Sequence, residues 1–171
     1  AGAYGSIYWL PKIKKNHPTS MVYQLGDSGV GVITDDFNAQ AKNVWNYMHN
    51  MPRWVPGIEA KINSDIRLVD FYLAISDYYP NTRFSQFTTA NDEIQKFFYE
   101  LMGGVPEKWA KITKQQLDTI SNSSNNFSYY HAKGIEHCIL PYGRMGATEQ
   151  DNISFVTWLD AFIKDMPVDN V

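Results

Sequence analysis

The sequence predicts an α/β fold built on a mostly parallel sheet with helices on its faces. Three short segments rich in aromatic and β-branched residues, 21–25, 83–88 and 127–131, alternate with longer segments of helical periodicity. Strands separated by helices indicate parallel βαβ units, whose crossovers are right-handed. Of the 171 residues, 44% are hydrophobic and 19% are charged, as expected of a globular protein the size of one domain.

The first predicted element is a helix over residues 3–16, in which apolar side chains recur at roughly helical spacing. His17-Pro18-Thr19 ends this pattern. The first strand, 21–25, follows and leads into Gly26-Asp27-Ser28-Gly29, a composition typical of a turn.

Two helices are expected between the first and second strands. Asp36 can cap the first of them, which ends near Met51-Pro52. Residues 54–57 form an expected loop with prolines on both sides, and Ser64 or Asp65 then opens the second helix.

Two further helices are expected between the second and third strands. Asn91 or Asp92 can cap the first of them, and Gly103-Gly104 ends it. Pro106 opens the next, which extends to about Ser121. The apolar residues on one side of the first helix are Ile94, Phe97, Phe98 and Leu101.

After the third strand, residues 134–146 are expected to be irregular and 152–164 to form the last helix. Three strands with about six helices leave too much helix for the sheet and an exposed strand edge. The organisation therefore predicts that residues 1–171 are the C-terminal portion of a single larger α/β domain, whose N-terminal strands lie outside this sequence.

Charge and hydropathy argue against two classes of partner. The net charge is −3, and Lys12, Lys14 and Lys15 are too few to make a nucleic-acid surface. No apolar run approaches the roughly 18 residues needed to cross a bilayer. We therefore expect neither nucleic acid nor a membrane span.

Cys138 is the only cysteine, so these residues cannot form an intrachain disulfide. No second Cys or suitably spaced His accompanies it, so a small packing residue is expected rather than a metal ligand. N-glycosylation sequons begin at Asn122, Asn126 and Asn152. They permit a secreted or cell-surface location without establishing it.

Candidate chemistry lies where the predicted strands end, because active sites of open parallel sheets lie beyond the carboxyl ends of the strands. Asp27, Asp92 and His137 follow the first, second and third strands. A Ser hydroxyl becomes a good nucleophile when a His accepts its proton and a carboxylate orients that His. Asp92 is the preferred acid, with helix capping as its alternative role, and His137 is the preferred base, with a structural hydrogen-bonded role as its alternative.

Other residue types near the strand ends fit catalysis less well. Asp27, within its Gly-rich turn, is expected to be structural. Ser28 lacks the Gly-x-Ser-x-Gly spacing of a nucleophile elbow. His17, His49 and His131 lie at a helix end, within a helical pattern and within or at the end of a strand, and are weaker candidates for the base.

The opening residues Ala1-Gly2-Ala3-Tyr4-Gly5-Ser6 are small and precede the first helix directly. Small side chains allow close backbone approach at a sharp strand-to-helix turn, as in the nucleophile elbow of α/β-hydrolases. In that interpretation the Ser immediately precedes Ala1. The alternative is an ordinary or processed N-terminus.

Four segments carry a resemblance that covers nearly the whole chain. Residues 1–6 match the end of a Gly-x-Ser-Ala-Gly-(Ala/Gly)-x-Gly-Ser elbow, and 25–29 match a strand-end Asp-(Ser/Ala)-Gly turn. Residues 89–95 match an acid-bearing segment, and 134–138 match Gly-x-x-His-Cys. In this order the segments resemble the pectin acetylesterase-like hydrolases, which are related to the Notum carboxylesterases.

The resemblance implies an α/β-hydrolase fold in which Asp92 is the acid, His137 the base and the backbone N–H of Ala1 an oxyanion donor. It implies a serine carboxylesterase for acetyl or similar short acyl esters, including esters on polysaccharides, that needs no metal or cofactor. Because the nucleophile would precede Ala1, these residues alone are expected to be inactive. The chain lacks the many cysteines of plant and animal members and is more similar to microbial branches. The alternative is a non-catalytic binding or assembly protein on the same fold.

Overall fold

The expected parallel sheet is present in the computed structural model, which describes residues 2–141 and 143–171. Its three strands are β1 (Tyr23–Asp27), β2 (Arg83–Thr89) and β3 (Phe127–Ala132). They are hydrogen-bonded in the order β1-β2-β3, and both pairs are parallel. The α/β class predicted from the alternation of strands and helices is therefore confirmed.

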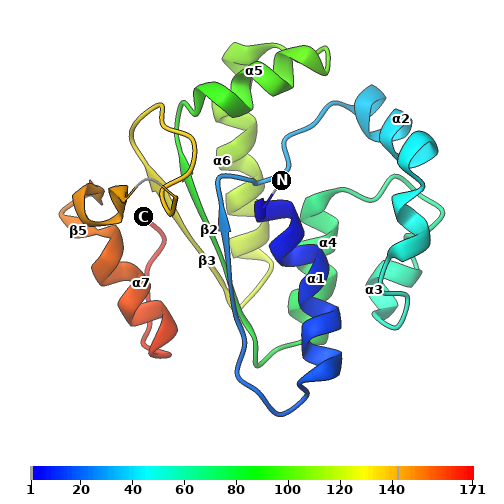
Figure 1. Cartoon of the computed structure of the whole chain (residues 1–171), viewed down its shortest axis with the longest axis horizontal. Helices are drawn as coiled ribbons and strands as arrows, with labels where there is room; N and C mark the ends of the chain where they lie inside the picture. The colour runs from blue at the N-terminus through cyan, green and yellow to red at the C-terminus, as the bar shows by residue number, and fades with distance from the viewer. Residues whose placement is uncertain (1, 142) are drawn as a thin grey trace.

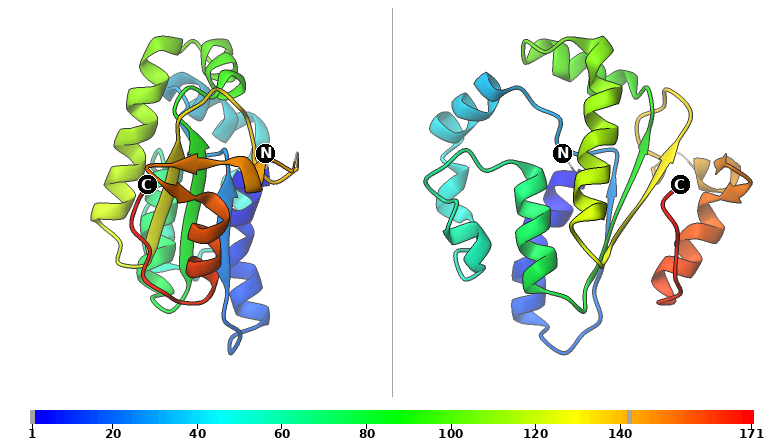
Figure 2. Two further views of the ribbon diagram at one scale, coloured as in Figure 1. Left: turned by 90° about the vertical axis from the view of Figure 1, so that its left-hand side faces the viewer. Right: turned by 180° about the vertical axis from the view of Figure 1, so that it is seen from behind.

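Helices cover both faces of this sheet (Figures 1 and 2). One face is covered by α1 (Gly2–Asn16), α4 (Leu68–Tyr78) and α6 (Pro106–Asn122). The opposite face is covered by α7 (Phe155–Ile163). The covering helices leave the carboxyl ends of the strands available for functional loops.

Side chains on the two faces of the sheet pack into two separate clusters of buried residues. Phe84 of β2 packs with the helices α1, α4 and α6, whereas Phe87 packs with α7. This alternation follows from the two-residue period of a strand. Burying each aromatic side chain contributes about 1.5–3 kcal/mol, so both faces stabilise the central strand.

The remaining helices lie farther from the sheet. α5 (Glu93–Leu101) lies beyond the carboxyl ends of the strands, and α2 (Asp35–Trp45) and α3 (Pro56–Glu59) lie outside α4 in Figure 1. The short elements are the 3-10 helices η1 (Tyr47–Asn50) and η2 (Arg144–Ala147), and an antiparallel pair of β4 (Glu149–Gln150) and β5 (Ile153–Ser154).

Three predicted helix starts are wrong, including that of α7, which begins at Phe155 after its cap Ser154 rather than at residue 152. Thr34, rather than Asp36, caps α2, because its hydroxyl accepts the Phe37 N–H at 3.2 Å and donates to the Met102 carbonyl at 2.6 Å. The next long helix, α4, begins after Arg67 instead of at Ser64 or Asp65, and the expected proline-flanked loop contains the start of α3. The cap of α2 is thus tied to a residue 68 positions away, whereas the start of α4 is capped locally, by the Asp70 carboxylate that accepts the Arg67 N–H.

The two edges of the sheet differ. Val171 accepts the His131 N–H at 2.7 Å and donates its own N–H to the Tyr129 carbonyl at 3.1 Å. The chain end thereby pairs with the outer edge of β3. In the part of the chain that the structure describes, no strand pairs with the outer edge of β1.

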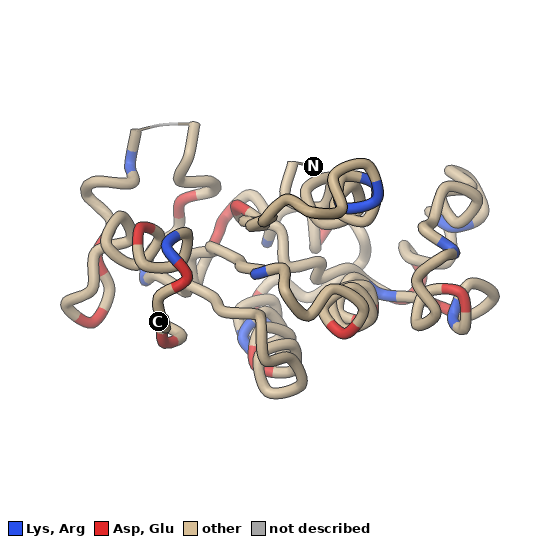
Figure 3. The backbone as a smooth tube through the Cα atoms, turned by 90° about the horizontal axis from the view of Figure 1, so that it is seen from below, with Lys and Arg blue, Asp and Glu red and all other residues tan. Residues whose placement is uncertain are grey.

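Charged residues of both signs are distributed along the chain, with Lys and Arg interspersed with Asp and Glu (Figure 3). Within residues 2–141 and 143–171, none of the helices combines the length and apolar character needed to span a membrane.

Candidate active site

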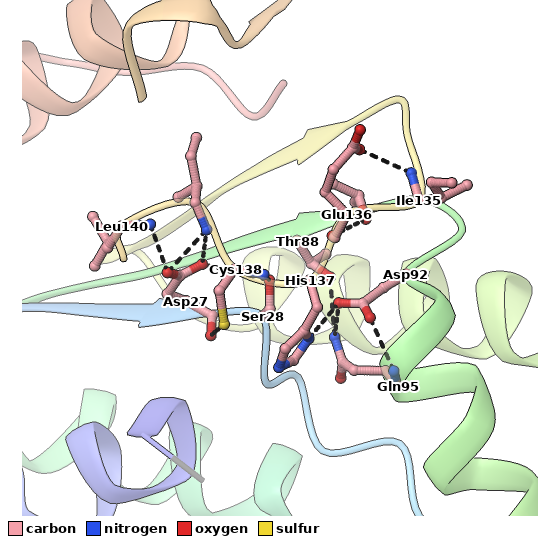
Figure 4. Close-up of polar contacts among 12 residues, drawn as sticks. Asp27, Ser28, Thr88, Asp92, Gln95, Ile135, Glu136, His137, Cys138 and Leu140 are labelled. Carbon is pink, nitrogen blue, oxygen red and sulfur yellow. Dashed lines mark hydrogen bonds and ion pairs between the residues drawn. The ribbon is translucent and has the colours of Figure 1, made fainter. Parts of the chain in front are cut away.

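The three loops that leave the carboxyl ends of the strands converge, and they bring together the residues proposed from the sequence (Figure 4). Asp27 ends β1, Asp92 follows β2, and His137 lies in the loop after β3. The imidazole Nδ1 of His137 lies 2.8 Å from Oδ2 of Asp92. The expected contact between these two side chains is therefore present.

Asp92 is fixed by the N-terminus of α5, which it caps. Its Oδ1 accepts the backbone N–H of Gln95 at 2.9 Å, and its Oδ2 accepts the Gln95 side-chain amide at 3.0 Å. The Asp92 side chain is completely buried, and its carboxylate lies at the positive end of the α5 helix dipole. The two roles weighed for Asp92, helix cap and partner of His137, are filled by the same carboxylate.

This geometry leaves one ring nitrogen of His137 available for a reaction. A carboxylate only accepts hydrogen bonds, so Nδ1 is the donor, and in the neutral ring Nε2 then carries the lone pair that can accept a proton. The His137 side chain keeps 31% of its surface exposed, while Asp92 is shielded beneath it. Such a pair can act as a general base that is oriented by a buried acid.

The loop that carries His137 is held on its N-terminal side by the end of β2. The Thr89 hydroxyl donates to the Glu136 carbonyl at 2.8 Å. The backbone N–H groups of Asn91 and Glu93 donate to the carbonyls of Gly134 and Ile135, each at 3.0 Å. These contacts tie the loop to the same segment that carries Asp92.

On its C-terminal side the same loop is held by the turn that ends β1. The Asp27 carboxylate accepts the N–H groups of Ile139, at 3.0 and 3.1 Å, and of Leu140, at 2.9 Å. The Ser28 hydroxyl accepts the Cys138 N–H at 2.9 Å. Asp27 therefore binds backbone groups, as expected of a structural residue, and Asp92 is the only carboxylate bonded to His137 among the described residues.

Ser28 is close to this site but its hydroxyl is already engaged. It accepts from Cys138 and lies 3.4 Å from Oδ1 of Asp27, to which it can donate. Within the described chain, no hydroxyl or thiol hydrogen-bonds the ring of His137. The described residues thus bring a carboxylate and an imidazole together, with no hydroxyl or thiol hydrogen-bonded to that ring.

Cys138 is partly buried and its Sγ lies 3.7 Å from the Asp27 carbonyl. Burial raises the pKa of the Cys138 thiol, and the negative charges of Asp27 and Asp92 raise it further. The thiol therefore stays protonated at neutral pH, where the neutral form is a poor nucleophile.

The start of α1 lies against the turn after β1. A Cβ atom built on Gly29 would lie only 2.3 Å from the Cβ of Ala3. Ser28, the residue before Gly29, bonds the loop of His137, so the turn after β1 contacts both the first turn of α1 and that loop. Ala1, whose N–H was proposed as an oxyanion donor, lies outside the described residues.

Three residues that shape this site were not identified from the sequence. They are Gln95, Thr89 and Ser28, the last as the hydrogen-bond acceptor for the loop that carries His137. The Asp92-x-x-Gln95 spacing resembles a capping box and was the one signal for Gln95. Contacts of Thr89 and Ser28 join segments far apart in the chain, so no local pattern marks them.

The described residues include no group of three His, Cys, Asp or Glu side chains placed to hold a metal ion. The three weaker histidine candidates are not bonded to a carboxylate within the described chain, and the pKa of His131 is lowered chiefly by burial.

Comparison of the chain with protein-family models, curated proteins and solved structures finds no match in any of the three.

Proposed function

We propose that these residues form the C-terminal portion of a serine carboxylesterase of the α/β-hydrolase type. The hydrogen bond between Asp92 and His137 at the carboxyl ends of parallel strands carries this proposal. The serine nucleophile is assigned to the position directly before Ala1. The order of the triad along the chain is then Ser, Asp, His, which is the order used by α/β-hydrolases.

In this mechanism the Ser hydroxyl attacks the ester carbonyl while Nε2 of His137 takes its proton. Asp92 stabilises the resulting imidazolium through Nδ1. The tetrahedral intermediate carries its negative charge on the former carbonyl oxygen, for which the Ala1 N–H is the proposed donor. The imidazolium then protonates the departing alkoxide, leaving an acyl-enzyme and the alcohol.

Water completes the cycle at the same residues. His137 removes a proton from water as the water oxygen attacks the acyl group, and a second tetrahedral intermediate forms. Its collapse breaks the bond to the Ser oxygen, which recovers the proton from His137, and the carboxylic acid departs. The reaction consumes one water and requires no metal or organic cofactor.

Two features of the fold support a nucleophile just before α1. The contact between Ala3 and Gly29 places the start of α1 at the carboxyl end of β1. The outer edge of β1, where no described strand pairs, offers hydrogen-bonding groups to a strand leading into α1. We propose that this strand belongs to the N-terminal remainder of the same domain.

The substrate class rests on the sequence resemblance. We propose acetyl or similar short acyl esters, with acetylated polysaccharide as the natural source, and a secreted or cell-surface location. The partly exposed His137 side chain is consistent with a site that a large ester-bearing substrate reaches from solvent.

Hydrolysis of p-nitrophenyl acetate by the full-length protein tests the proposal. We expect His137→Ala and Asp92→Asn each to lower kcat by roughly 10³-fold or more, because the base is lost or held in the wrong tautomer. Replacing the Ser before Ala1 by Ala is expected to do the same. The exposed His49→Ala is the matched control and should hydrolyse at the wild-type rate.

Equal rates for the wild type and His137→Ala would reject His137 as the base. A residue other than Ser before Ala1, together with no hydrolysis by the full-length protein, would favour the non-catalytic binding protein instead. In that case the same fold would bind a ligand without cleaving it.

A further inference from the structure

Three consecutive backbone N–H groups directly after His137 are bound by two side chains at the carboxyl end of β1. The N–H groups belong to Cys138, Ile139 and Leu140, and their acceptors are the Ser28 hydroxyl and the Asp27 carboxylate. Figure 4 shows both acceptors rising from the end of β1 toward this loop. We call this arrangement the Asp27–Ser28 clamp.

The clamp holds backbone that would not adopt this shape by itself. Ser28 and Cys138 are both in the left-handed region, with φ of 59° and 62°. Non-glycine residues adopt this conformation at a cost unless their surroundings enforce it. The Asp27 carboxylate accepts consecutive N–H groups at 2.9–3.1 Å, and such charge-assisted hydrogen bonds offset this cost.

His137 therefore lies between two independent anchors. Before it, the Glu136 carbonyl is bound by Thr89 of β2; after it, residues 138–140 are bound by the clamp from β1. The imidazole itself makes one hydrogen bond among the described residues, to Asp92. Its orientation consequently depends on where the two anchors place its backbone.

We propose that Asp27 and Ser28 are positioning residues for His137: they hold its backbone so that Nδ1 meets Asp92 and Nε2 faces the reacting hydroxyl. The catalytic part of this inference rests on the proposed esterase function. The part that concerns the orientation of the His137 ring toward Asp92 does not depend on that function. Neither residue contacts the reacting atoms in this assignment, so each acts through the loop.

The test compares Asp27→Asn and Ser28→Ala with two matched variants in the full-length protein. Asp70→Asn alters a carboxylate that accepts the Arg67 N–H at 3.0 Å in α4, and Ser154→Ala removes a hydroxyl that accepts the Thr157 N–H at 3.1 Å in α7. Each control weakens one side-chain acceptor of a backbone N–H group away from His137, and Asp70→Asn also removes the ion pair with Lys61. All four variants are expected to lower Tm by a few degrees, roughly 2–6 °C.

The first readout is the Nδ1–H proton of His137 in NMR spectra of protein labelled with ¹⁵N-histidine, assigned by its loss in His137→Gln. In the wild type this proton, bonded to a buried carboxylate, is expected to give a slowly exchanging low-field signal. We expect the signal to broaden or disappear in Asp27→Asn and Ser28→Ala and to persist in both controls. This measurement does not depend on any esterase activity.

The second readout is hydrolysis of p-nitrophenyl acetate. Misplacing the base is expected to lower kcat by roughly 10- to 100-fold in the two clamp variants, with KM changed less than about twofold. The controls should keep the wild-type kcat. An unchanged Nδ1–H signal in both clamp variants would overturn the positioning role, whether or not the protein proves to be an esterase.

Complete loss of hydrolysis in Ser28→Ala with an intact Nδ1–H signal would also overturn it, because Ser28 would then be the nucleophile. If His137→Ala retains full activity but the clamp variants lose the signal, the esterase proposal fails and the ring-positioning role stands. The two proposals can therefore fail separately.

Discussion

At the scale of single residues, Asp92 shows how one carboxylate can cap a helix and accept a hydrogen bond from a histidine at the same time. A carboxylate has four lone-pair positions, and three hydrogen bonds occupy the Asp92 oxygens here. The N-terminus of α5 and the His137 ring both donate hydrogen bonds to this carboxylate. Helix capping and orientation of His137 therefore reinforce each other.

Cys138 gives a prediction at this scale. Because burial and the nearby carboxylates raise its pKa, little thiolate is present at pH 7, and alkylation by iodoacetamide should be slower than in the urea-unfolded chain. The midpoint of the pH–rate profile should lie above that of the unfolded chain. Mass spectrometry of the peptide containing Cys138 follows the reaction.

The Asp27→Asn variant provides the matched comparison for Cys138. Removing one negative charge should lower the pKa of the thiol and move the midpoint of its pH–rate profile downward. A folded-state midpoint at or below that of the unfolded chain would contradict the assignment.

At the scale of elements, the contact between the start of α1 and the turn after β1 decides how the helix meets the sheet. Gly29 faces Ala3 so closely that no side chain fits between them. Ile7 and Leu10, farther along α1, are buried in the same layer as α4 and α6. The small residue at each side of the contact lets the rest of the helix pack on the sheet.

Gly29→Ala should therefore destabilise the protein by about 1–3 kcal/mol, because the new methyl group collides with Ala3 and forces α1 away from β1. Gly5→Ala is the matched change within α1, where an added Cβ meets no atom within 4 Å. It should instead stabilise the protein by about 0.5–1 kcal/mol through helix propensity. Urea unfolding measures both changes, and equal midpoints for the two variants would show that the close approach does not constrain the helix.

At the scale of the whole molecule, a single amide joins three elements at the end of the sheet opposite the candidate site. The side-chain nitrogen of Asn126 donates to the carbonyls of Ser76, Tyr79 and Thr82 at 3.2, 3.1 and 2.9 Å. These carbonyls lie at the end of α4 and before β2, while Asn126 itself precedes β3. The contact thus fixes where two crossover connections return to the sheet.

Asn126→Ala should lower the free energy of unfolding by about 1–3 kcal/mol, because partly buried carbonyls lose their donor. Asn122→Ala alters an exposed asparagine of another sequon and should change stability by less than about 0.5 kcal/mol. Urea unfolding of the two variants tests the difference. An equal loss of stability in the two variants would mean that the Asn126 side-chain amide does not organise this end of the sheet.

Sequence patterns located the second and third strands and the starts of α1, α5 and α6, but displaced the first strand by two residues and missed the starts of α2, α4 and α7. The strand 83–88 is recognisable from its aromatic and β-branched residues, and β2 occupies Arg83–Thr89. The start of α2 depends on Thr34, whose hydroxyl also bonds the Met102 carbonyl across 68 positions of sequence. A cap of this kind cannot be distinguished from Asp36 by local composition.

The four apolar residues expected on one side of α5 show a second limit. Ile94, Phe97, Phe98 and Leu101 do share a helix, as their spacing predicts, but each is 45–66% exposed. Helical periodicity indicates which residues lie on one face. It contains no information about whether another element covers that face.

The sequence by itself determined the α/β class and the residues that follow each strand, because periodicity and turn composition are local properties. It named Asp92 and His137 as candidates but could not show that Asp92, 45 positions away, meets His137 while Asp27 binds backbone instead. The tertiary structure decided this through the strand order β1-β2-β3. Since β2 is the neighbour of β3, the ends of those two strands place Asp92 beside the imidazole, and the end of β1 supports the loop after it.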